Sequence, residues 1–250
     1  MDKILDIAIN SIRIDLPDKK KYLFKNIHLQ IKTNSIYAIV GENGKGKTTL
    51  LKSILNLVDQ SIFKIDGEIQ FYGINMMNCE LNKLRTILRD ECKYILQDSS
   101  DCFDPMRKIG YYFSGDKIDE KYFSELLDYF LLPKAENIIN HYPHELSIGM
   151  AQRLAIIWGL LLKPKLLLLD EPNSALDISL SNLLSIKLKE VAEEQKMTVL
   201  FISQDIDFAV NTASRIGLLT DNELIEFEKR DFGKLKEAYL KNSIRINNNG

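Results

Sequence analysis

Apolar and polar residues alternate along much of the chain up to Ile31, which is the pattern of half-buried β-strands. Ile4 to Leu16 alternates in this way, with a one-residue slip after Ile9, and Ile27 to Ile31 alternates again. The residues between these stretches are largely charged, and we expect Asp18 to Lys21 to form a charged turn. The chain is therefore predicted to begin with strands that have one buried face.

Three shorter runs are almost continuously apolar, as expected of parallel strands that are buried on both faces. They are Ile36 to Val40, Leu166 to Leu169 and Thr198 to Ile202. Helical patterns follow two of these runs, over Lys47 to Leu57 and from about Ala175 to Lys196. Strands that alternate with helices of this length predict a parallel α/β sheet.

The middle of the chain, about residues 99–162, has mainly helical periodicity. We expect a helical subdomain there, with Trp158 in its core, inserted into an α/β core of about residues 1–98 and 163–228. Residues 229–250 form a short C-terminal tail, and the positive lean of Lys229 to Arg245 predicts a solvated terminal helix.

Composition narrows the class of protein only slightly. The net charge of −2 gives no reason to expect a nucleic acid partner, and 45% hydrophobic residues are usual for a globular protein. The three cysteines lack a CxxC pair, which suits buried thiols in a reducing compartment. The longest apolar stretch, Leu154 to Leu162, is under half of the roughly 20 residues that span a bilayer. We also find no secretory signal, so membrane association is expected to be peripheral.

The sharpest motif is GENGKGKT, which matches the phosphate-binding P-loop GxxxxGK[ST]. It follows a predicted buried strand and opens a predicted helix, so that backbone N–H groups would face an anion. Lys47 would neutralise the β- and γ-phosphates, and the Thr48 hydroxyl would bind Mg²⁺. The predicted ATP-binding residues are Gly41, Glu42, Asn43, Gly44, Lys45, Gly46, Lys47, Thr48 and Thr49.

A second candidate site lies at the end of the run Leu166 to Leu169, which is followed by Asp170 and Glu171. A parallel strand delivers such carboxylates to the carboxyl edge of the sheet, where ligands of α/β proteins bind. Asp170 is expected to organise Mg²⁺, and Glu171 to polarise an attacking water as a general base.

Between these two sites lies HYPHELSIGMAQR, residues 141–153, which resembles the signature region of ATP-binding cassette (ABC) ATPases. Residues 94–98 resemble the Q-loop of that family, and residues 174–177 resemble its D-loop. The resemblance covers about residues 4–227. It implies a single nucleotide-binding domain with a P-loop NTPase core, an N-terminal antiparallel β-subdomain and an inserted α-helical subdomain.

Finer details are similar to one branch of the family, the oligopeptide, dipeptide and nickel importer ATPases. QD at residues 97–98, FDP at 103–105 and YPHELS at 142–147 carry this likeness. The resemblance implies an ATPase subunit that drives import of a peptide or metal chelate from the cytoplasmic face of the membrane. Its partners would be a second ABC ATPase, transmembrane permease subunits and, indirectly, an extracytoplasmic solute-binding protein.

The resemblance also implies roles for residues outside the two motifs. Two subunits would close head-to-tail around two ATP molecules, and Ser147 and Gly149 would contact the nucleotide held by the partner. Gln97 would link Mg²⁺ and the attacking water to the helical subdomain. Gln204 takes the place of the switch histidine of the family, beside the γ-phosphate.

Two positions depart from the family pattern. Gln204 can donate a hydrogen bond but cannot carry the positive charge available to histidine. Ile148 replaces the first glycine of the signature, and a β-branched side chain resists positive φ and blocks close backbone approach. One interpretation is tolerated drift. The other is a heterodimer, in which Gln204 impairs the site of this chain and Ile148 impairs the site of its partner.

Other functions stay open at this point. They are an ABC exporter, a non-transport ABC ATPase acting on nucleic acid or ribosomes, and a pseudo-enzyme that binds ATP as a clamp. The lack of a strong positive charge argues against an ABC ATPase that acts on nucleic acid or ribosomes. The presence of Glu171 argues against a pseudo-enzyme. The aromatic residue that stacks on adenine is not evident: Ile12 and Ile14 lie where it is expected, and Tyr22 is the nearby candidate.

Overall fold

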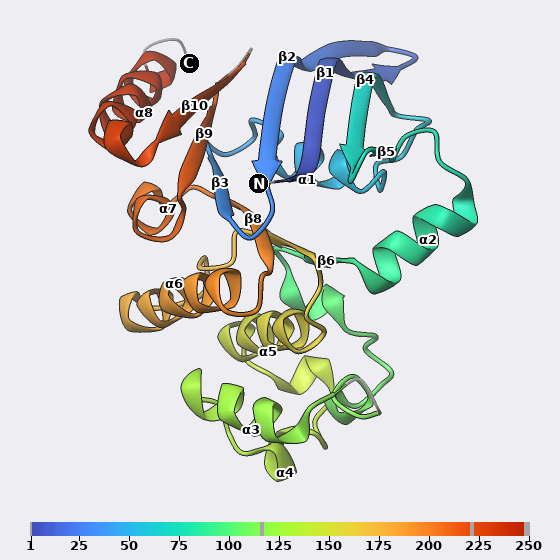
Figure 1. Cartoon of the computed structure of the whole chain (residues 1–250), viewed down its shortest axis with the longest axis vertical. Coiled ribbons are helices and arrows are strands. Elements are labelled where there is room, and N and C mark those ends of the chain that lie inside the picture. The colour runs from blue at the N-terminus through green and yellow to red at the C-terminus, as the bar shows by residue number, and fades with distance from the viewer. Residues whose placement is uncertain (1, 116–117, 221–222, 248–250) are drawn as a thin grey trace.

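The computed structural model describes residues 2–115, 118–220 and 223–247. Its strands form two sheets, and most of its helices lie on one side of the larger sheet (Figure 1). This arrangement confirms the predicted α/β class with a P-loop NTPase core. The helices of these ranges are α1 (Lys47–Ile54), α2 (Leu81–Asp90), α3 (Glu120–Tyr129), α4 (Ala135–Ile138), α5 (Ile148–Leu161), α6 (Ile178–Glu193), α7 (Ile206–Thr212) and α8 (Phe232–Asn247).

The smaller sheet is antiparallel and has the strand order β2-β1-β4-β5. Its strands are β1 (Lys3–Leu16), β2 (Lys19–Lys32), β4 (Phe63–Phe71) and β5 (Ile74–Asn75). The predicted charged turn is wrong in extent, because only residues 17–18 turn and β2 already begins at Lys19. Lysines at positions 20 and 21 lie in an edge strand, where charged side chains oppose pairing with another chain.

The one-residue slip in the alternation of β1 is a β-bulge. Ile9 pairs with Gly67 of β4 and Ser11 pairs with Asp66, so that Asn10 has no partner on β4. Gly67 has a φ of 136°, and a Cβ atom there would lie 2.3 Å from the carbonyl oxygen of Ala8. The bulge therefore needs a glycine opposite it, and after it Ile12 is again on the buried face.

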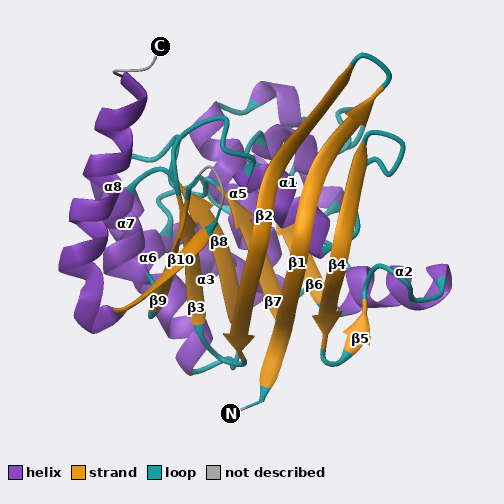
Figure 2. Ribbon diagram, turned by 90° about the horizontal axis from the view of Figure 1, so that it is seen from above, coloured by secondary structure: helices purple, strands orange, loops and turns teal. Residues whose placement is uncertain are grey.

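The larger sheet has the strand order β10-β9-β3-β8-β7-β6, and β10 alone runs antiparallel to its neighbour. Its strands are β3 (Ile36–Val40), β6 (Cys92–Ile95), β7 (Leu166–Asp170), β8 (Thr198–Ser203), β9 (Arg215–Leu219) and β10 (Leu224–Glu228). Both faces are covered, since Ala38 of β3 packs toward the helices while Ile39 packs toward the smaller sheet and α1. The continuously apolar runs follow from this double burial. Figure 2 shows the smaller sheet on the opposite side from the helical layer.

Every regular element that the structure describes between residues 99 and 161 is helical. Besides α3, α4 and α5 these are the 3₁₀ turns η1 (Ser99–Cys102), η2 (Ile109–Tyr111) and η3 (Pro143–Glu145). Trp158 lies in the predicted aromatic core, with its ring centroid 6.1 Å from that of Phe103 and 5.6 Å from that of Tyr112. Helix α5 packs both on the larger sheet and on α3, so it connects the helical segment to the α/β core.

Two helix boundaries and the burial of the terminal helix differ from the predictions. Helix α1 ends at Ile54, and Asn56 has a φ of 53°, which is incompatible with a continuing helix. Helix α6 starts at Ile178, because Asp177 caps it by accepting from the N–H of Leu180. The terminal helix exists, after the 3₁₀ turn η4 (Lys229–Asp231), but it is not fully solvated: Phe232 and Leu235 of α8 are buried.

None of the helices that the structure describes is both long and apolar enough to cross a bilayer. The thiols at positions 79, 92 and 102 are free, which agrees with the predicted absence of a disulfide framework. Cys92 is buried as predicted, and burial raises the pKa of its thiol to about 12. Cys79 and Cys102 are only partly buried.

Candidate functional site

The predicted site residues meet at the carboxyl ends of three neighbouring parallel strands. The P-loop follows β3, Asp170 is the last residue of β7, and Gln204 follows the end of β8. In the sheet these strands lie side by side in the order β3-β8-β7. Residues more than 100 positions apart in sequence are thereby brought to one edge, where α/β folds bind ligands.

The glycines of the P-loop have local structural reasons to be glycine. Gly44 and Gly46 have φ values of 75° and 82°, in the left-handed region that side chains disfavour. A Cβ atom at Gly46 would also lie 2.7 Å from the ring of Phe24, and one at Gly41 would lie 2.8 Å from the carbonyl oxygen of Leu219. The loop therefore holds a compact turn directly before α1, whose first N–H groups have no intrahelical partners.

Lys47 is the buried cation of the site. Its ammonium donates to the carbonyl oxygens of Gly41, at 2.8 Å, and Glu42, at 3.0 Å. It also lies 3.5 Å from Oε1 of Glu171, and both side chains are under a tenth exposed. Burial lowers the pKa of Lys47, and the negative charge of Glu171 opposes that shift.

Asp170 connects the P-loop to the end of β7. Its Oδ1 accepts from the Thr48 hydroxyl at 3.2 Å, and its Oδ2 accepts from the Tyr94 hydroxyl at 2.9 Å. Burial raises the pKa of Asp170, whereas the hydrogen bonds from Tyr94 and Thr48 oppose this shift. A carboxylate beside a hydroxyl offers the hard oxygen donors that Mg²⁺ prefers, so the side chains present fit that ion.

Glu171 is held in an unusual backbone conformation, with a φ of 50°. Its N–H donates to the carbonyl oxygen of Ile202 at 3.0 Å, and its carbonyl accepts from Nε2 of Gln152 at 3.0 Å. On the side chain, Oε2 accepts from the N–H of Gln204 at 3.1 Å. The carboxylate is therefore fixed between Lys47 and the loop after β8.

The signature segment lies at the start of α5. Ser147 caps this helix, since its hydroxyl accepts from the N–H of Met150 at 3.2 Å. Ile148 is the first helical residue, so the expected conflict with a positive φ is wrong: the helix needs none. Its side chain is 79% exposed, which keeps it available to block close approach. Gly149 packs against residues 174–177, because a Cβ atom there would lie 3.1 Å from the carbonyl oxygen of Ala175.

Gln97 is exposed and lies with the signature segment rather than with Asp170. It lines a cavity of about 160 Å³ together with Leu146, Ile148 and Ala175. The structure therefore divides the predicted site into two groups. One is the buried cluster of Lys47, Asp170 and Glu171, and the other is an exposed group around the start of α5.

The comparisons with known proteins agree with this geometry. The sequence model of the ABC transporter family matches residues 24–174, which is more than half of the chain. The chain belongs to the ABC transporter family. The matched range contains residues 141–153 and ends at Ser174, the first residue of the segment 174–177.

Relatives with assigned transport roles are similar over most of the chain. It is 29% identical to the oligopeptide transport ATP-binding protein OppD of Bacillus subtilis, over 81% of this chain and 59% of the relative. It is also 29% identical to the metal-staphylopine import system ATP-binding protein CntD of Staphylococcus aureus, over 84% of this chain and 80% of that protein. The chain thus spans about three-fifths of the OppD relative.

A solved ABC cassette has the same fold. The dimeric structure of a cassette in a post-hydrolysis state, bound to ADP and phosphate, superposes with a TM-score of 0.77 at 28% identity. The match covers 90% of this chain and 99% of that cassette. The fold of an ATP-hydrolysing cassette is therefore shared nearly end to end.

The predicted site residues differ in how far they are exposed. Asn43 and Gly44 are exposed at the tip of the P-loop, whereas Glu42, Lys45 and Thr49 are partly buried. Tyr22, the candidate for adenine stacking, lies in β2 opposite Arg13 and is half exposed, with the Lys25 ammonium 4.6 Å from its ring centroid. Ile12 is fully buried between the sheets.

Sequence reasoning gave no role to three polar residues that organise the ABC site. Tyr94 bonds Asp170, and Gln152 bonds Glu171. Asn173 bonds both Ser203 and Asp205, on either side of Gln204, in the loop after β8 that we call the switch loop (residues 203–205). Gln152 and Asn173 lie within or beside the motifs, so their position was a signal. The sequence signal for Tyr94 was weaker, because only the pairing of β6 with β7 in the sheet brings its hydroxyl to Asp170.

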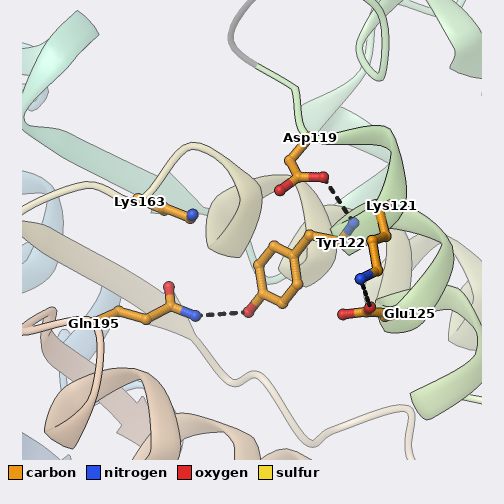
Figure 3. Close-up of a pocket in the computed structure, with 6 residues that line it drawn as sticks. All are labelled: Asp119, Lys121, Tyr122, Glu125, Lys163 and Gln195. Carbon is orange, nitrogen blue, oxygen red and sulfur yellow. Dashed lines mark hydrogen bonds and ion pairs between the residues drawn. The ribbon is translucent and has the colours of Figure 1, made fainter.

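A larger cavity of about 270 Å³ lies elsewhere, between the start of α3 and the segments after α5 and α6 (Figure 3). It contains none of the predicted site residues. Across it, Nε2 of Gln195 donates to the Tyr122 hydroxyl at 2.8 Å, and Lys121 pairs loosely with Glu125. Its lining carries charges of both signs, and the hydrogen bond from Gln195 links α3 to the segment after α6.

Proposed function

We propose that this chain binds ATP with Mg²⁺ and hydrolyses it, as the ATPase subunit of an import system for a small solute. The observation that carries the proposal is the convergence of two motifs. Lys47 and Thr48 of the P-loop contact Glu171 and Asp170 at the end of β7. Phosphate-binding groups, a metal-binding carboxylate and a second carboxylate thus meet at one edge of the sheet.

The side chains present support this chemistry. Thr48 and Asp170 would hold Mg²⁺, which when bound supplies charge that stabilises the phosphate oxygens. Lys47 would exchange its carbonyl partners for the β- and γ-phosphates, and the N-terminus of α1 would face the same anion. Glu171 would orient a water and accept its proton, since its carboxylate is buried and already directed by two partners.

The proposed partners are a second ABC ATPase, transmembrane permease subunits and, indirectly, an extracytoplasmic solute-binding protein. The relatives are named as transport proteins for oligopeptides and for metal-staphylopine, which favours a peptide or metal chelate as cargo. Such a subunit would work at the cytoplasmic face of the membrane as a peripheral protein. No nucleic acid partner is proposed, and co-purification with permease subunits rather than with nucleic acid tests this choice.

We further infer that the second ATPase is a different chain and that the site of this chain turns over slowly. Gln204 lacks the charge that histidine would bring beside the γ-phosphate. Ile148 projects an exposed β-branched side chain from the signature region, which would face the nucleotide of the partner. Each departure therefore weakens a different one of the two composite sites.

Steady-state ATPase activity of the purified chain tests this function, beside Glu171→Gln and Gln204→His. We expect slow turnover that falls about 10²- to 10⁴-fold in Glu171→Gln with ATP binding retained, as for loss of a general base. Gln204→His should increase the rate. ATP binding without turnover in either wild type or Gln204→His would contradict independent hydrolysis, and failure to bind ATP would contradict the whole assignment.

A further inference from the structure

The C-terminal helix α8 returns to the catalytic edge of the sheet. Phe232 and Leu235 bury its inner face, and Lys236 pairs with Asp207 of α7 at the periphery. Figure 1 shows α8 beside β10 and α7. In sequence, α8 is the last helix and lies far from the P-loop. One turn beyond Leu235, the Tyr239 hydroxyl donates to the carbonyl oxygen of Gln204 at 3.1 Å. The tail therefore contacts the switch loop directly.

Three hydrogen bonds in total hold the two peptide groups on either side of Gln204. In the preceding peptide, the N–H of Gln204 donates to Oε2 of Glu171 at 3.1 Å. In the following peptide, the carbonyl accepts from Tyr239 and the N–H of Asp205 donates to Oγ of Ser203 at 3.0 Å. A rotation of this loop would move the hydrogen bond to Glu171 and the direction of the Gln204 side chain together.

We propose that Tyr239 is a positioning residue for ATP hydrolysis, which clamps the main chain of Gln204 so that its N–H holds the Glu171 carboxylate in place. The proposal rests on the proposed function, because it assigns Glu171 as the general base. Tyr239 would act through the backbone, because its hydroxyl bonds the main-chain carbonyl of Gln204. Its role is therefore independent of whether position 204 carries glutamine or histidine.

The surroundings of Tyr239 favour a stable donor. Burial raises the pKa of its hydroxyl, and the nearby carboxylates of Glu42, Glu171 and Asp205 raise it further. The hydroxyl thus stays protonated at neutral pH and can donate to a carbonyl. Because the hydroxyl lies 3.1 Å from the carbonyl oxygen of Gln204, whose N–H holds Glu171, a small displacement of this loop would reach the base.

The test compares Tyr239→Phe with Tyr122→Phe as a matched control. Both tyrosines are partly buried, and each hydroxyl bonds a glutamine, but Tyr122 meets Gln195 in the cavity of Figure 3, away from the site. Loss of one hydrogen bond should lower kcat about 3- to 10-fold in Tyr239→Phe, with the KM for ATP changed less than about twofold. Tyr122→Phe should keep the wild-type kcat.

A second background separates the backbone from the side chain. In Gln204→Ala the main-chain carbonyl remains, so Tyr239→Phe should lower kcat by the same factor as in wild type. A factor that disappears in Gln204→Ala would overturn the proposal, because Tyr239 would then act through the glutamine side chain. A wild-type kcat in Tyr239→Phe would overturn it as well.

Hydrogen exchange measures the clamp without any need for turnover. In Tyr239→Phe, the amides of residues 203–206 should exchange about 3- to 10-fold faster than in wild type, while Tyr122→Phe leaves them unchanged. Unchanged exchange in Tyr239→Phe would overturn the proposal. An inactive wild-type chain with faster exchange in Tyr239→Phe would instead contradict the proposed function and leave the clamp established.

Discussion

The two halves of the proposed ATP site differ in how completely this chain builds them. The P-loop half is buried and connected: Lys47, Asp170 and Glu171 are all under a tenth exposed, Lys47 pairs with Glu171, and Asp170 accepts from the Thr48 hydroxyl. The signature half is exposed, at Ile148 at the start of α5 and at Gln97. A cluster of buried charges needs partners from its own chain. An exposed helix start can instead await a partner from another chain.

Lys47 should show the largest effect, because the P-loop half depends on its charge. We expect Lys47→Met to weaken ATP binding about 100-fold, since it removes charge-assisted hydrogen bonds worth about 2.8 kcal/mol. Calorimetric titration with ATP measures the change. The control is Lys165→Met, which removes an exposed lysine just before β7, at the opposite end from Asp170. Equal affinity losses in the two variants would contradict a specific role for Lys47.

Gln152 connects the two halves, and its loss should affect stability. Its side chain bonds the carbonyl of Glu171 and the N–H of Ala175, at 3.0 and 3.1 Å. Gln152→Leu leaves the N–H of Ala175 unpaired, whereas the carbonyl of Glu171 keeps the N–H of Ser174 at 3.2 Å. The free energy of unfolding should therefore fall by about 2 kcal/mol, measured by urea denaturation.

Gln195→Leu provides the comparison for that prediction. Among the described residues, Oε1 of Gln195 is buried without a hydrogen-bond partner, so its removal relieves part of the cost. A loss of stability in Gln195→Leu as large as in Gln152→Leu would show that Gln152 is not a specific link between the halves.

Thr48 should have a smaller effect, confined to the metal. Thr48→Val keeps the shape of the side chain but removes the hydroxyl that lies 3.2 Å from Oδ1 of Asp170. The Mg²⁺ concentration for half-maximal ATPase activity should rise about tenfold, as expected for loss of one oxygen ligand. Thr86→Val removes an exposed hydroxyl on α2, and its Mg²⁺ dependence should equal that of wild type.

Ile148 should give the smallest change, and only when two chains meet. In the Glu171→Gln background, Ile148→Gly should strengthen ATP-dependent self-association about threefold, because the backbone of α5 can then approach a second nucleotide. Analytical ultracentrifugation with and without ATP measures it. Leu240→Gly removes another exposed apolar side chain, from α8, and should leave self-association unchanged. Association that ignores ATP in every variant would contradict a composite site.

Much of the fold could be predicted from the pattern of apolar residues. The apolar runs became β3, β7 and β8 because strands buried on both faces have no polar positions. The alternating stretch became β1, and its slip became the bulge at Asn10. The predicted helix boundaries were wrong where a single residue ends or starts the helix, as at Asn56 beyond α1 and Asp177 before α6. The apolar periodicity continues past these residues and therefore does not reveal them.

By itself, the sequence determined which residues form the proposed phosphate-binding half of the site. The P-loop glycines, Lys47, Asp170 and Glu171 are local motifs, since their geometry depends on a turn or on the end of one strand. Only the tertiary structure decided which side chains hold them. Gln152 reaches Glu171 from α5, and Tyr239 reaches Gln204 from α8, 35 positions along the chain. These contacts depend on how helices pack on the sheet, and one residue in a helix gives no local pattern for that packing.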